Sequence, residues 1–266
     1  MNSLLAEKKR RIAYQFSQSA HRYDDIAQVQ LDIGFDAIQL VTGNKSGRLL
    51  DIGCGTGRLT QRLADKFQGV TGVDLATGMI EQAKKCNPAK NTKGHIDFHV
   101  ADAEALPFAD KSFDNVFSCM ALQWCTPIQT SLDEINRVLT DQGKGVLALL
   151  SAGSMVELHK TWAKVDAVPR VNQFLSHREL VSAAIKSGFS VEEHQKTYTT
   201  WHQTAIHLLN SIRHIGANVV PETGNHRRLS RQSLAEFARI YNQDFAINGQ
   251  LPLSYEVSFL ILSKNI

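Results

Sequence analysis

The chain has 266 residues, of which 43% are hydrophobic and 21% charged, and its formal net charge is +3. This composition is that of an ordinary globular protein and excludes a disordered or fibrous chain, and the length suits one large domain or a domain with a sizeable insertion. Apolar runs are far shorter than the ~20 residues of a membrane span, and the N-terminal segment lacks the apolar stretch of a secretory signal. The four cysteines form no CxxC pair, so we expect reduced thiols in a cytoplasmic protein without a metal site.

The first forty residues show helical periodicity, which predicts an N-terminal helical region. Basic residues concentrate in segments 1–22 and 205–240, whereas segment 49–118 is nearly neutral. Basic flanks around a neutral middle indicate an anionic partner near the flanks. The alternative, that these charges serve solubility alone, stays open.

From residue 48 onward, short apolar runs alternate with helical patterns. The expected strands are 48–52, 69–74, 96–101, 113–120 and 145–151, and the expected helices lie near 58–67, 77–86 and 128–140. Thr77 is a candidate N-cap for the middle helix. Near-continuous apolar strands alternating with helices predict an α/β fold with a doubly wound parallel sheet covered on both faces.

The last third of the chain departs from this alternation. A helix is expected near 177–187, a strand at 189–200 and a final strand at 255–263. About fifty residues separate the last two strands, with helical patterns at 203–215 and 230–241. The sheet therefore carries two helical attachments, one N-terminal and one inserted late.

The strongest local pattern is LLDIGCGTGR at 49–58, where a strand runs through Gly53, Gly55 and Gly57 into a helix. Glycines allow positive φ and close approach of a ligand, and the helix N-terminus supplies unpaired N–H groups. The dinucleotide fingerprint needs a small residue where Arg58 stands. Asp51 would repel a pyrophosphate but suits a ligand with an ammonium or sulfonium group. A plain strand–helix turn is the structural alternative.

Two further acids end the next two strands. Asp74 can accept hydrogen bonds from two ribose hydroxyls, and Asp102 can accept one from an exocyclic adenine amine. With Asp51, three acids at successive strand ends line one edge of the sheet, which is where open α/β sheets bind ligands. Each acid alone has the alternative role of a helix N-cap.

The run DIGCGTG, GVD, VADAEALPF and SFDNVFSCMALQW, within residues 47–152, resembles the class I S-adenosylmethionine-dependent methyltransferases. The resemblance implies a seven-stranded Rossmann-like sheet with an antiparallel last strand, S-adenosyl-L-methionine as methyl donor and S-adenosyl-L-homocysteine as product. In that family a short turn normally joins the last two strands, so the roughly fifty residues that separate them here are interpreted as a helical substrate lid at 203–252. The remaining domains are then an N-terminal helical cap at 1–46 and a core of 47–202 and 253–266. The expected cofactor-binding residues are Asp51, Gly53, Gly55, Gly57, Asp74, Leu75, Met79, Asp102, Ala103, Met120, Gln123 and Tyr23.

Features outside these motifs resemble the malonyl-acyl-carrier-protein O-methyltransferases of biotin synthesis, the BioC family. They include FSQSA at 16–20, LQWC at 122–125 and SIRHIGA at 211–217. One departure is Cys119, where we expect Asn. The resemblance implies methyl transfer to the free carboxylate of a malonyl thioester on acyl carrier protein. The product is the malonyl methyl ester that primes pimeloyl synthesis for biotin.

A malonyl carboxylate is ionised near neutral pH, so the transfer needs alignment and a water-poor pocket rather than a general base. No catalytic residue is therefore assigned. The expected substrate-binding residues are Phe16, Trp124, Arg213 and His214. The expected contacts to the acidic carrier protein are Lys8, Lys9, Arg10, Arg11, Arg227, Arg228 and Arg231, with a solvated surface as the alternative for each cluster. No nucleic-acid or membrane partner is expected.

Two other functions stay open. A small-molecule methyltransferase, acting for instance on a quinone precursor, would methylate a free acceptor without a carrier protein. A nucleotide-binding oxidoreductase shares the strand–glycine turn–helix and the acid on the second strand, but it needs the small residue that Arg58 replaces.

Overall fold

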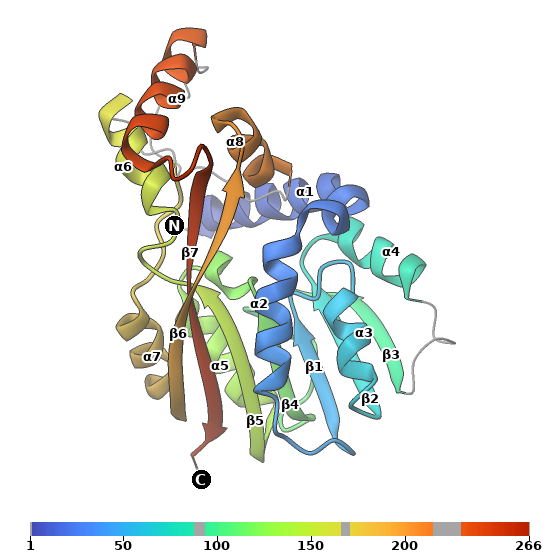
Figure 1. Ribbon diagram of the computed structural model, residues 1–266. Coiled ribbons are helices and arrows are strands. Elements are labelled where there is room, and N and C mark those ends of the chain that lie inside the picture. The colour runs from blue at the N-terminus through green and yellow to red at the C-terminus, as the bar shows by residue number, and fades with distance from the viewer. Residues whose placement is uncertain (1, 88–93, 166–170, 215–229, 266) are drawn as a thin grey trace.

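The computed structural model describes residues 2–87, 94–165, 171–214 and 230–265, and its arrangement is drawn in Figure 1. The strands are β1 (Arg48–Ile52), β2 (Gly69–Asp74), β3 (His95–Val100), β4 (Phe113–Cys119), β5 (Leu139–Leu150), β6 (Phe189–His202) and β7 (Leu251–Lys264). The helices are α1 (Asn2–Ile26), α2 (Gln28–Gln39), α3 (Arg58–Ala64), α4 (Thr77–Cys86), α5 (Ile128–Val138), α6 (Val156–Val165), α7 (His177–Lys186), α8 (Ala205–His214) and α9 (Arg231–Phe245), with a 3-10 turn η2 at Leu122–Trp124.

The seven strands form one sheet in the order β3-β2-β1-β4-β5-β7-β6. The first five strands pair in parallel, and β7 lies antiparallel between β5 and β6. This confirms the predicted doubly wound sheet with an antiparallel last strand. Strands β2 and β3 lie on one side of β1, and β4 and β5 lie on the other, so the chain changes direction across the sheet at β1. Such a switch point is where α/β sheets bind ligands.

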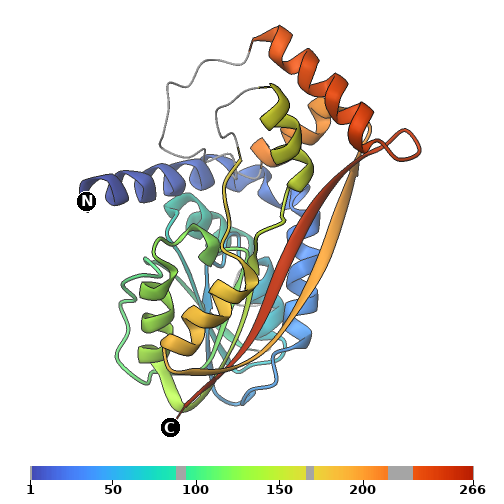
Figure 2. The same cartoon turned by 90° about the vertical axis from the view of Figure 1, so that its left-hand side faces the viewer.

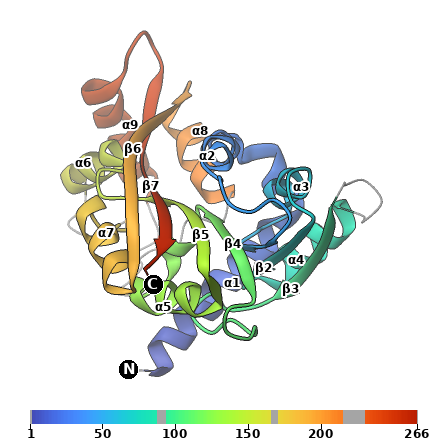
Figure 3. The same ribbon diagram turned by 90° about the horizontal axis from the view of Figure 1, so that it is seen from below.

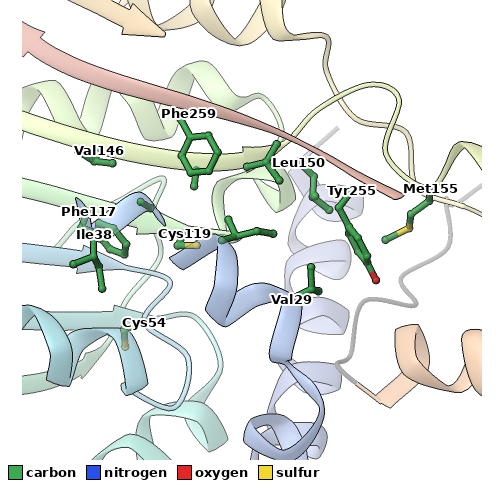
Figure 4. Packing of buried hydrophobic residues seen from close by; sticks show 14 of the residues in the cluster. Val29, Ile38, Cys54, Phe117, Cys119, Val146, Leu150, Met155, Tyr255 and Phe259 are labelled. Atoms are coloured by element: carbon green, nitrogen blue, oxygen red, sulfur yellow. The ribbon is translucent and has the colours of Figure 1, made fainter. Parts of the chain in front are cut away.

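Both faces of the sheet are buried, as the near-continuous apolar strands predict. Leu49 and Leu50 are adjacent in β1 and both 0% exposed, yet they belong to different hydrophobic cores. One core packs against α2, α3 and α4, and the other against α5 and α7. Seen along the strands in Figure 3, helices flank the sheet on both sides. Figure 4 shows Ile38 of α2 beside Phe117 of β4 in the first core.

Helix α1 lies across the carboxyl edge of the parallel strands, as Figure 2 shows. The backbone N–H of Gly78 in α4 donates to Ser17 Oγ at 3.1 Å, and Thr56 Oγ1 donates to Asp24 Oδ1 at 2.6 Å. These bonds hold α1 against α4 and against the turn after β1. The sheet edge that binds ligands in this fold is therefore covered by the N-terminal helix.

Strands β6 and β7 pair over their whole length and rise beyond the rest of the sheet, with α8 and α9 between them in the chain (Figures 1 and 2). Both strands are longer than predicted, because the segment beyond the core is itself packed. Leu251 and Leu253 are fully buried there, and Tyr241 of α9 donates to the carbonyl of Pro252 at 2.6 Å.

Three details of the predicted elements are wrong. The N-cap residue of α4 is Ala76 and not Thr77, and the Asp74 carboxylate accepts from the backbone N–H of Ala76. Strand β5 begins at Leu139, inside the expected helix near 128–140, since the buried residues of α5 end at Val138. Helix α6 was not predicted, and in the structure it packs against α9 and β7. Among the described residues, no helix is both long and apolar enough to cross a membrane.

Candidate functional site

The glycine turn after β1 requires glycine for reasons of geometry. Gly53, Gly55 and Gly57 have φ values of +74°, +55° and +81°. The N–H groups of Gly53 and Cys54 both donate to the carbonyl of Val73, at 2.7 and 2.9 Å, which pulls the turn against β2. A Cβ on Gly53 would lie 2.0 Å from the Cβ of Ala121, so the turn admits no side chain there. The backbone at Gly55 is open, because an added Cβ would meet no atom within 4 Å.

Asp74 ends β2 directly beside this turn. Its Oδ2 accepts from the N–H of Gly55 at 3.0 Å, and its Oδ1 accepts from that of Ala76 at 2.8 Å. Burial raises the pKa of Asp74, against these two backbone hydrogen bonds, which lower it. Each oxygen keeps a second lone pair, so the carboxylate can still accept hydrogen bonds from a pair of hydroxyls.

A cavity lies over the carboxyl ends of β1, β2, β3 and β4, under α1. This main cavity holds about 800 Å³ of space, including the solvent at its mouth. The expected cofactor residues that line it are Tyr23, Gly53, Gly55, Asp74, Leu75, Met79, Asp102, Ala103 and Met120. The structure thus brings together residues from α1, the glycine turn and three strand ends that the sequence placed at one sheet edge.

Three expected cofactor residues are not among those that line the main cavity. Asp51 lies beneath the turn, 2% exposed, and its Oδ2 accepts from Thr60 Oγ1 at 2.6 Å. Burial raises the pKa of Asp51 to about 7; the Thr60 hydrogen bond opposes this rise and the nearby Asp74 adds to it. Gly57 is the N-cap residue of α3, and a Cβ there would lie 2.7 Å from Phe98 Cζ. The third residue, Gln123, lines a neighbouring cavity.

Lys9 of α1 reaches into the main cavity and pairs with two acids there. Its Nζ lies 2.6 Å from Asp102 Oδ2 and 2.8 Å from Glu104 Oε2. Burial alone lowers the pKa of Lys9, but the hydrogen bonds to both acids outweigh it and leave the pKa above its ordinary value. Lys9 was predicted to contact a carrier protein, and no local sequence signal links it to Asp102, which is 93 residues away.

The other basic residues are distributed as follows. Lys8 donates to Thr126 Oγ1 at 3.2 Å, whereas Arg10 and Arg11 of α1 and Arg231 of α9 are exposed. Arg213 and His214 are the last two residues of α8, and their side chains lie outside the described part of the chain. Arg227 and Arg228 also lie outside the described residues.

A second, inner cavity of about 430 Å³ adjoins the main cavity. The residues that line it are Phe16, Tyr23, Gln30, Met120, Gln123, Trp124, Leu150, Met155, Asn172, Phe174 and Tyr255. Phe16 and Trp124, both expected to bind substrate, meet edge to face here, with ring centroids 5.7 Å apart. Figure 4 shows Tyr255 and Met155 close to Val29 of α2, where the first core borders this cavity.

A third cavity, which we call the turn cavity, also holds about 430 Å³ and is bounded by the glycine turn, α1 and α2. Arg58, the residue that departs from the dinucleotide fingerprint, donates from Nη1 to the carbonyl of Asp24 at 2.8 Å. Arg58 therefore fixes the end of α1 against the turn.

Tyr23 and Met120 line all three cavities, so these two residues mark their meeting point. Met120 has φ +57°, a left-handed conformation that is strained for a side chain of this kind. Its N–H donates to Ala148 at 2.8 Å and its carbonyl accepts from Gln123 Nε2 at 2.8 Å. Burial raises the pKa of Tyr23, which keeps its hydroxyl protonated.

Sequence reasoning missed Gln30, which lines both the inner and the turn cavity. The available signal was its position: Val29, Leu31 and Ile33 of the same helix are buried, so Gln30 is a polar residue within an apolar stretch. Asn172 and Phe174, which also line the inner cavity, were given no role at the site. Among the described residues, no group of three or more histidines, cysteines or acids could hold a metal ion.

A family model described as a methyltransferase domain matches residues 50–147. A malonyl-acyl-carrier-protein O-methyltransferase from Hamiltonella defensa is 32% identical over 97% of this chain and 95% of its own length. One from Hahella chejuensis is 31% identical over 97% of this chain and 92% of its own length.

A biotin biosynthesis bifunctional protein from Teredinibacter turnerae is 31% identical over 98% of this chain but only 48% of its own length, so this chain spans about half of that relative. Among solved structures, a putative methyltransferase from Bacillus halodurans aligns with a TM-score of 0.66 at 16% identity, over 88% of this chain and 99% of its own. An N-methyltransferase from Haemonchus contortus, solved with S-adenosylhomocysteine, aligns with a TM-score of 0.56 at 22% identity, over 88% and 52%. At these identities the two structures show a shared fold.

Proposed function

This chain belongs to the malonyl-acyl-carrier-protein O-methyltransferase family, and from that premise we propose that it methylates the free carboxylate of a malonyl thioester on acyl carrier protein. The methyl donor is S-adenosylmethionine, and the product is the malonyl methyl ester that primes pimeloyl synthesis for biotin. The observation that carries the proposal is the pair of adjoining cavities that meet at Tyr23 and Met120. One cavity suits the donor and the other suits the acceptor.

The main cavity fits an adenosine-bearing donor. Asp74 keeps free lone pairs for the two ribose hydroxyls, and Asp102 can accept from the adenine amine in the place that Lys9 Nζ now occupies. The apolar side chains of Leu75 and Met79 flank this space. The open backbone at Gly55 lets the donor approach the turn closely.

The bound donor supplies an electrophilic methyl group on a positively charged sulfur. The transfer forms one oxygen–carbon bond and breaks one carbon–sulfur bond, and no proton moves, because the malonyl carboxylate is already ionised. The work of the protein is alignment and exclusion of water. Tyr23 and Met120 fix the junction through which the two substrates meet, and the Phe16–Trp124 pair covers it.

The carrier protein is acidic in this proposal and docks on the basic attachments of the core. Arg10 and Arg11 of α1 and Arg231 of α9 are exposed and available for such contact. In this proposal segment 203–252 is the lid over the acceptor; its described helices are α8 and α9, and residues 215–229 lie outside the described part of the chain. A reducing, cytosolic setting completes the proposal, since Cys54, Cys86, Cys119 and Cys125 are all unpaired.

The test is mass spectrometry of malonyl carrier protein after incubation with the protein and S-adenosylmethionine. The proposal expects a gain of one methylene mass on the malonyl group. Acetyl carrier protein is the matched control and should stay unchanged, because it lacks the free carboxylate. Methylation of a free phenolic acceptor without activity on malonyl carrier protein would support a small-molecule methyltransferase instead.

A further inference from the structure

Lys9 occupies the part of the main cavity that Asp102 offers to a ligand. Of the described residues that line this cavity, Lys9 alone is basic, and it faces the acids Asp102 and Glu104. Its Nζ lies 2.6 Å from Asp102 Oδ2 and 2.8 Å from Glu104 Oε2. The side chains of Lys9 and Asp102 are 29% and 30% exposed, so a molecule that enters the cavity can reach the pair.

The two oxygens of Asp102 differ in what they can still accept. Oδ1 accepts from the backbone N–H of Glu104 at 2.9 Å, which fixes the carboxylate to its own loop. Oδ2 accepts from Lys9 Nζ. An adenine amine that donates to Oδ2 would lie beside this ammonium, and both groups donate hydrogen bonds without accepting them. The amine and Lys9 are therefore poor neighbours at the same oxygen.

Glu104 gives Lys9 a partner that does not depend on Asp102. Its Oε1 accepts from the backbone N–H of Thr126 at 3.3 Å, which holds the carboxylate on the loop before α5, and its Oε2 faces Lys9. When Lys9 gives up Asp102, its charge therefore stays paired with Glu104. The displacement loses one ion pair and leaves no unpaired ammonium in the cavity.

We propose that Lys9 competes with the adenine amine for Asp102 Oδ2 and so lowers the affinity of the site for both donor and product; this inference rests on the proposed function. In the empty protein Lys9 pairs with both acids, and in the complex it pairs with Glu104 alone. S-adenosylmethionine and S-adenosylhomocysteine carry the same adenine, so both meet this competitor. Weaker binding lets the product leave faster, and product release limits the turnover of many enzymes.

The same lysine distinguishes an amino group from a carbonyl group at position 6 of the purine. S-inosylhomocysteine carries a carbonyl oxygen there, which accepts hydrogen bonds and cannot pair with the Asp102 carboxylate. The ammonium of Lys9 has a third N–H that neither acid uses, and it can donate to this oxygen. Lys9 therefore opposes binding of the amino purine and favours binding of the oxo purine. A lysine with a purely structural role would change the affinity for both ligands in the same direction.

The experiment measures the affinities of S-adenosylhomocysteine and S-inosylhomocysteine by calorimetry for the parent protein and for Lys9→Met. Methionine keeps an unbranched side chain and removes the charge. We expect Lys9→Met to bind S-adenosylhomocysteine about fivefold more tightly and S-inosylhomocysteine about fivefold more weakly, which is the size of effect of a partly exposed ion pair.

Lys196→Met is the matched control. Lys196 Nζ also lies 2.6 Å from a carboxylate oxygen, Asp36 Oδ2, but neither residue lines any of the three cavities described above. This variant should keep both affinities within about twofold of the parent values.

Asp102→Ala tests whether the effect of Lys9 passes through the shared acceptor. Without this carboxylate the amine and Lys9 no longer compete, so Lys9→Met added to Asp102→Ala should change S-adenosylhomocysteine affinity by less than about twofold. Weaker binding of S-adenosylhomocysteine in Lys9→Met would overturn the inference, because Lys9 would then support the fold or the ligand. An unchanged affinity, or a gain that persists in the Asp102→Ala background, would overturn it as well.

The proposed function is judged separately, because these titrations contain no acceptor. If the parent protein binds S-adenosylhomocysteine but does not methylate malonyl carrier protein, the proposed acceptor is wrong, and calorimetry still decides the role of Lys9. If the parent protein does not bind S-adenosylhomocysteine, the donor site and the inference fail together.

Discussion

The main cavity and the inner cavity share Phe16, Tyr23, Met120 and Trp124, yet the rest of their linings differ in charge. The main cavity contains Lys9, Asp74, Asp102 and Glu104. The described residues that line the inner cavity carry amide, hydroxyl and apolar groups, and none of them has an ionised side chain. The difference suits the proposed reaction between a cation and an anion, because the carboxylates of the main cavity would face the cationic donor if it binds there.

The two linings are also built from different kinds of contact. The main cavity rests on a glycine turn that is tied by backbone hydrogen bonds to Val73 and Asp74. The inner cavity is assembled from the side chains of α1, α2, β7 and loops that are distant in sequence. We therefore expect backbone changes to disturb donor binding most, and side-chain changes to separate donor from acceptor binding.

The largest expected effect is that of Gly53→Ala. The new Cβ would lie 2.0 Å from Ala121, and φ is +74°, so the turn must move. We expect S-adenosylhomocysteine affinity, measured by calorimetry, to fall by on the order of a hundredfold.

Gly249→Ala is the control for backbone strain alone. Its φ is +77°, but an added Cβ would meet nothing within 4 Å, and the residue lies between α9 and β7. This variant should lose about 1–2 kcal/mol of unfolding free energy and keep its S-adenosylhomocysteine affinity. Equal losses of affinity in the two variants would contradict the special role of the turn at Gly53.

The next effect is that of Asp74→Ala. If Asp74 accepts from two ribose hydroxyls, as proposed, its removal is expected to weaken S-adenosylhomocysteine binding by ten- to a hundredfold, since hydrogen bonds to charged groups contribute about 1.5–3 kcal/mol each. Asp97→Ala, an exposed acid on β3, is the matched control and should bind as the parent does. An unchanged affinity in Asp74→Ala would remove the ribose-binding role of this residue.

The gathering of the residues that line the main cavity could be predicted from the sequence because its signals are local. The glycine turn and the acids Asp74 and Asp102 lie at or just after the ends of short strands, and parallel strands end at one edge. The binding of a donor by these residues stays a prediction. Asp51 shows the limit of this logic, because a residue at a strand end can point beneath the turn and bond Thr60 instead. Which side of the pleat a residue takes is set by packing that a short motif does not encode.

The acceptor side could not be predicted in the same way. Gln30 reaches the inner cavity only because α2 packs on the sheet beside α1 and β7, and the Lys9–Asp102 pair joins residues 93 positions apart. Helix α6 was missed for a related reason: its buried face packs against α9 and β7 from the far end of the chain. Such contacts depend on the tertiary fold and leave little trace in local periodicity.

A third prediction tests the charge difference between the cavities directly. The two complexes to compare are protein saturated with a donor analogue that carries an ammonium in place of the sulfonium, and protein saturated with neutral S-adenosylhomocysteine. If the donor supplies the counter-charge of the acceptor, malonyl-pantetheine should bind about tenfold more tightly to the first complex. Calorimetry on the two complexes measures this coupling. Equal affinities would instead assign the carboxylate to a cationic side chain of the protein, such as Arg213.

The smallest expected effect concerns the pH dependence contributed by Asp51. Burial raises the pKa of Asp51 to about 7 in the folded protein, whereas an unfolded Asp titrates near 3.9. Because the folded value is the higher one, the unfolded chain ionises first, and Asp51 increasingly destabilises the fold as pH rises from about 4 to about 7. Above the folded pKa the group is ionised in both states, and its cost stays constant.

Asp51→Asn removes this titration and keeps an oxygen that can accept from Thr60. The measurement is the unfolding free energy of the variant minus that of the parent, from denaturant unfolding of the ligand-free proteins. This difference should grow by about 1 kcal/mol between about pH 6 and pH 8, and the contributions of the other ionisable groups cancel in it. A difference that does not change with pH would show that Asp51 is already ionised in the fold.

Saturation with the ammonium analogue should flatten the dependence, because a nearby cation lowers the pKa of a carboxyl group. If neutral S-adenosylhomocysteine flattened the pH dependence equally, the effect would come from tightening of the turn rather than from charge. Asp51 would then stabilise the main cavity without contributing to its electrostatic attraction for the donor.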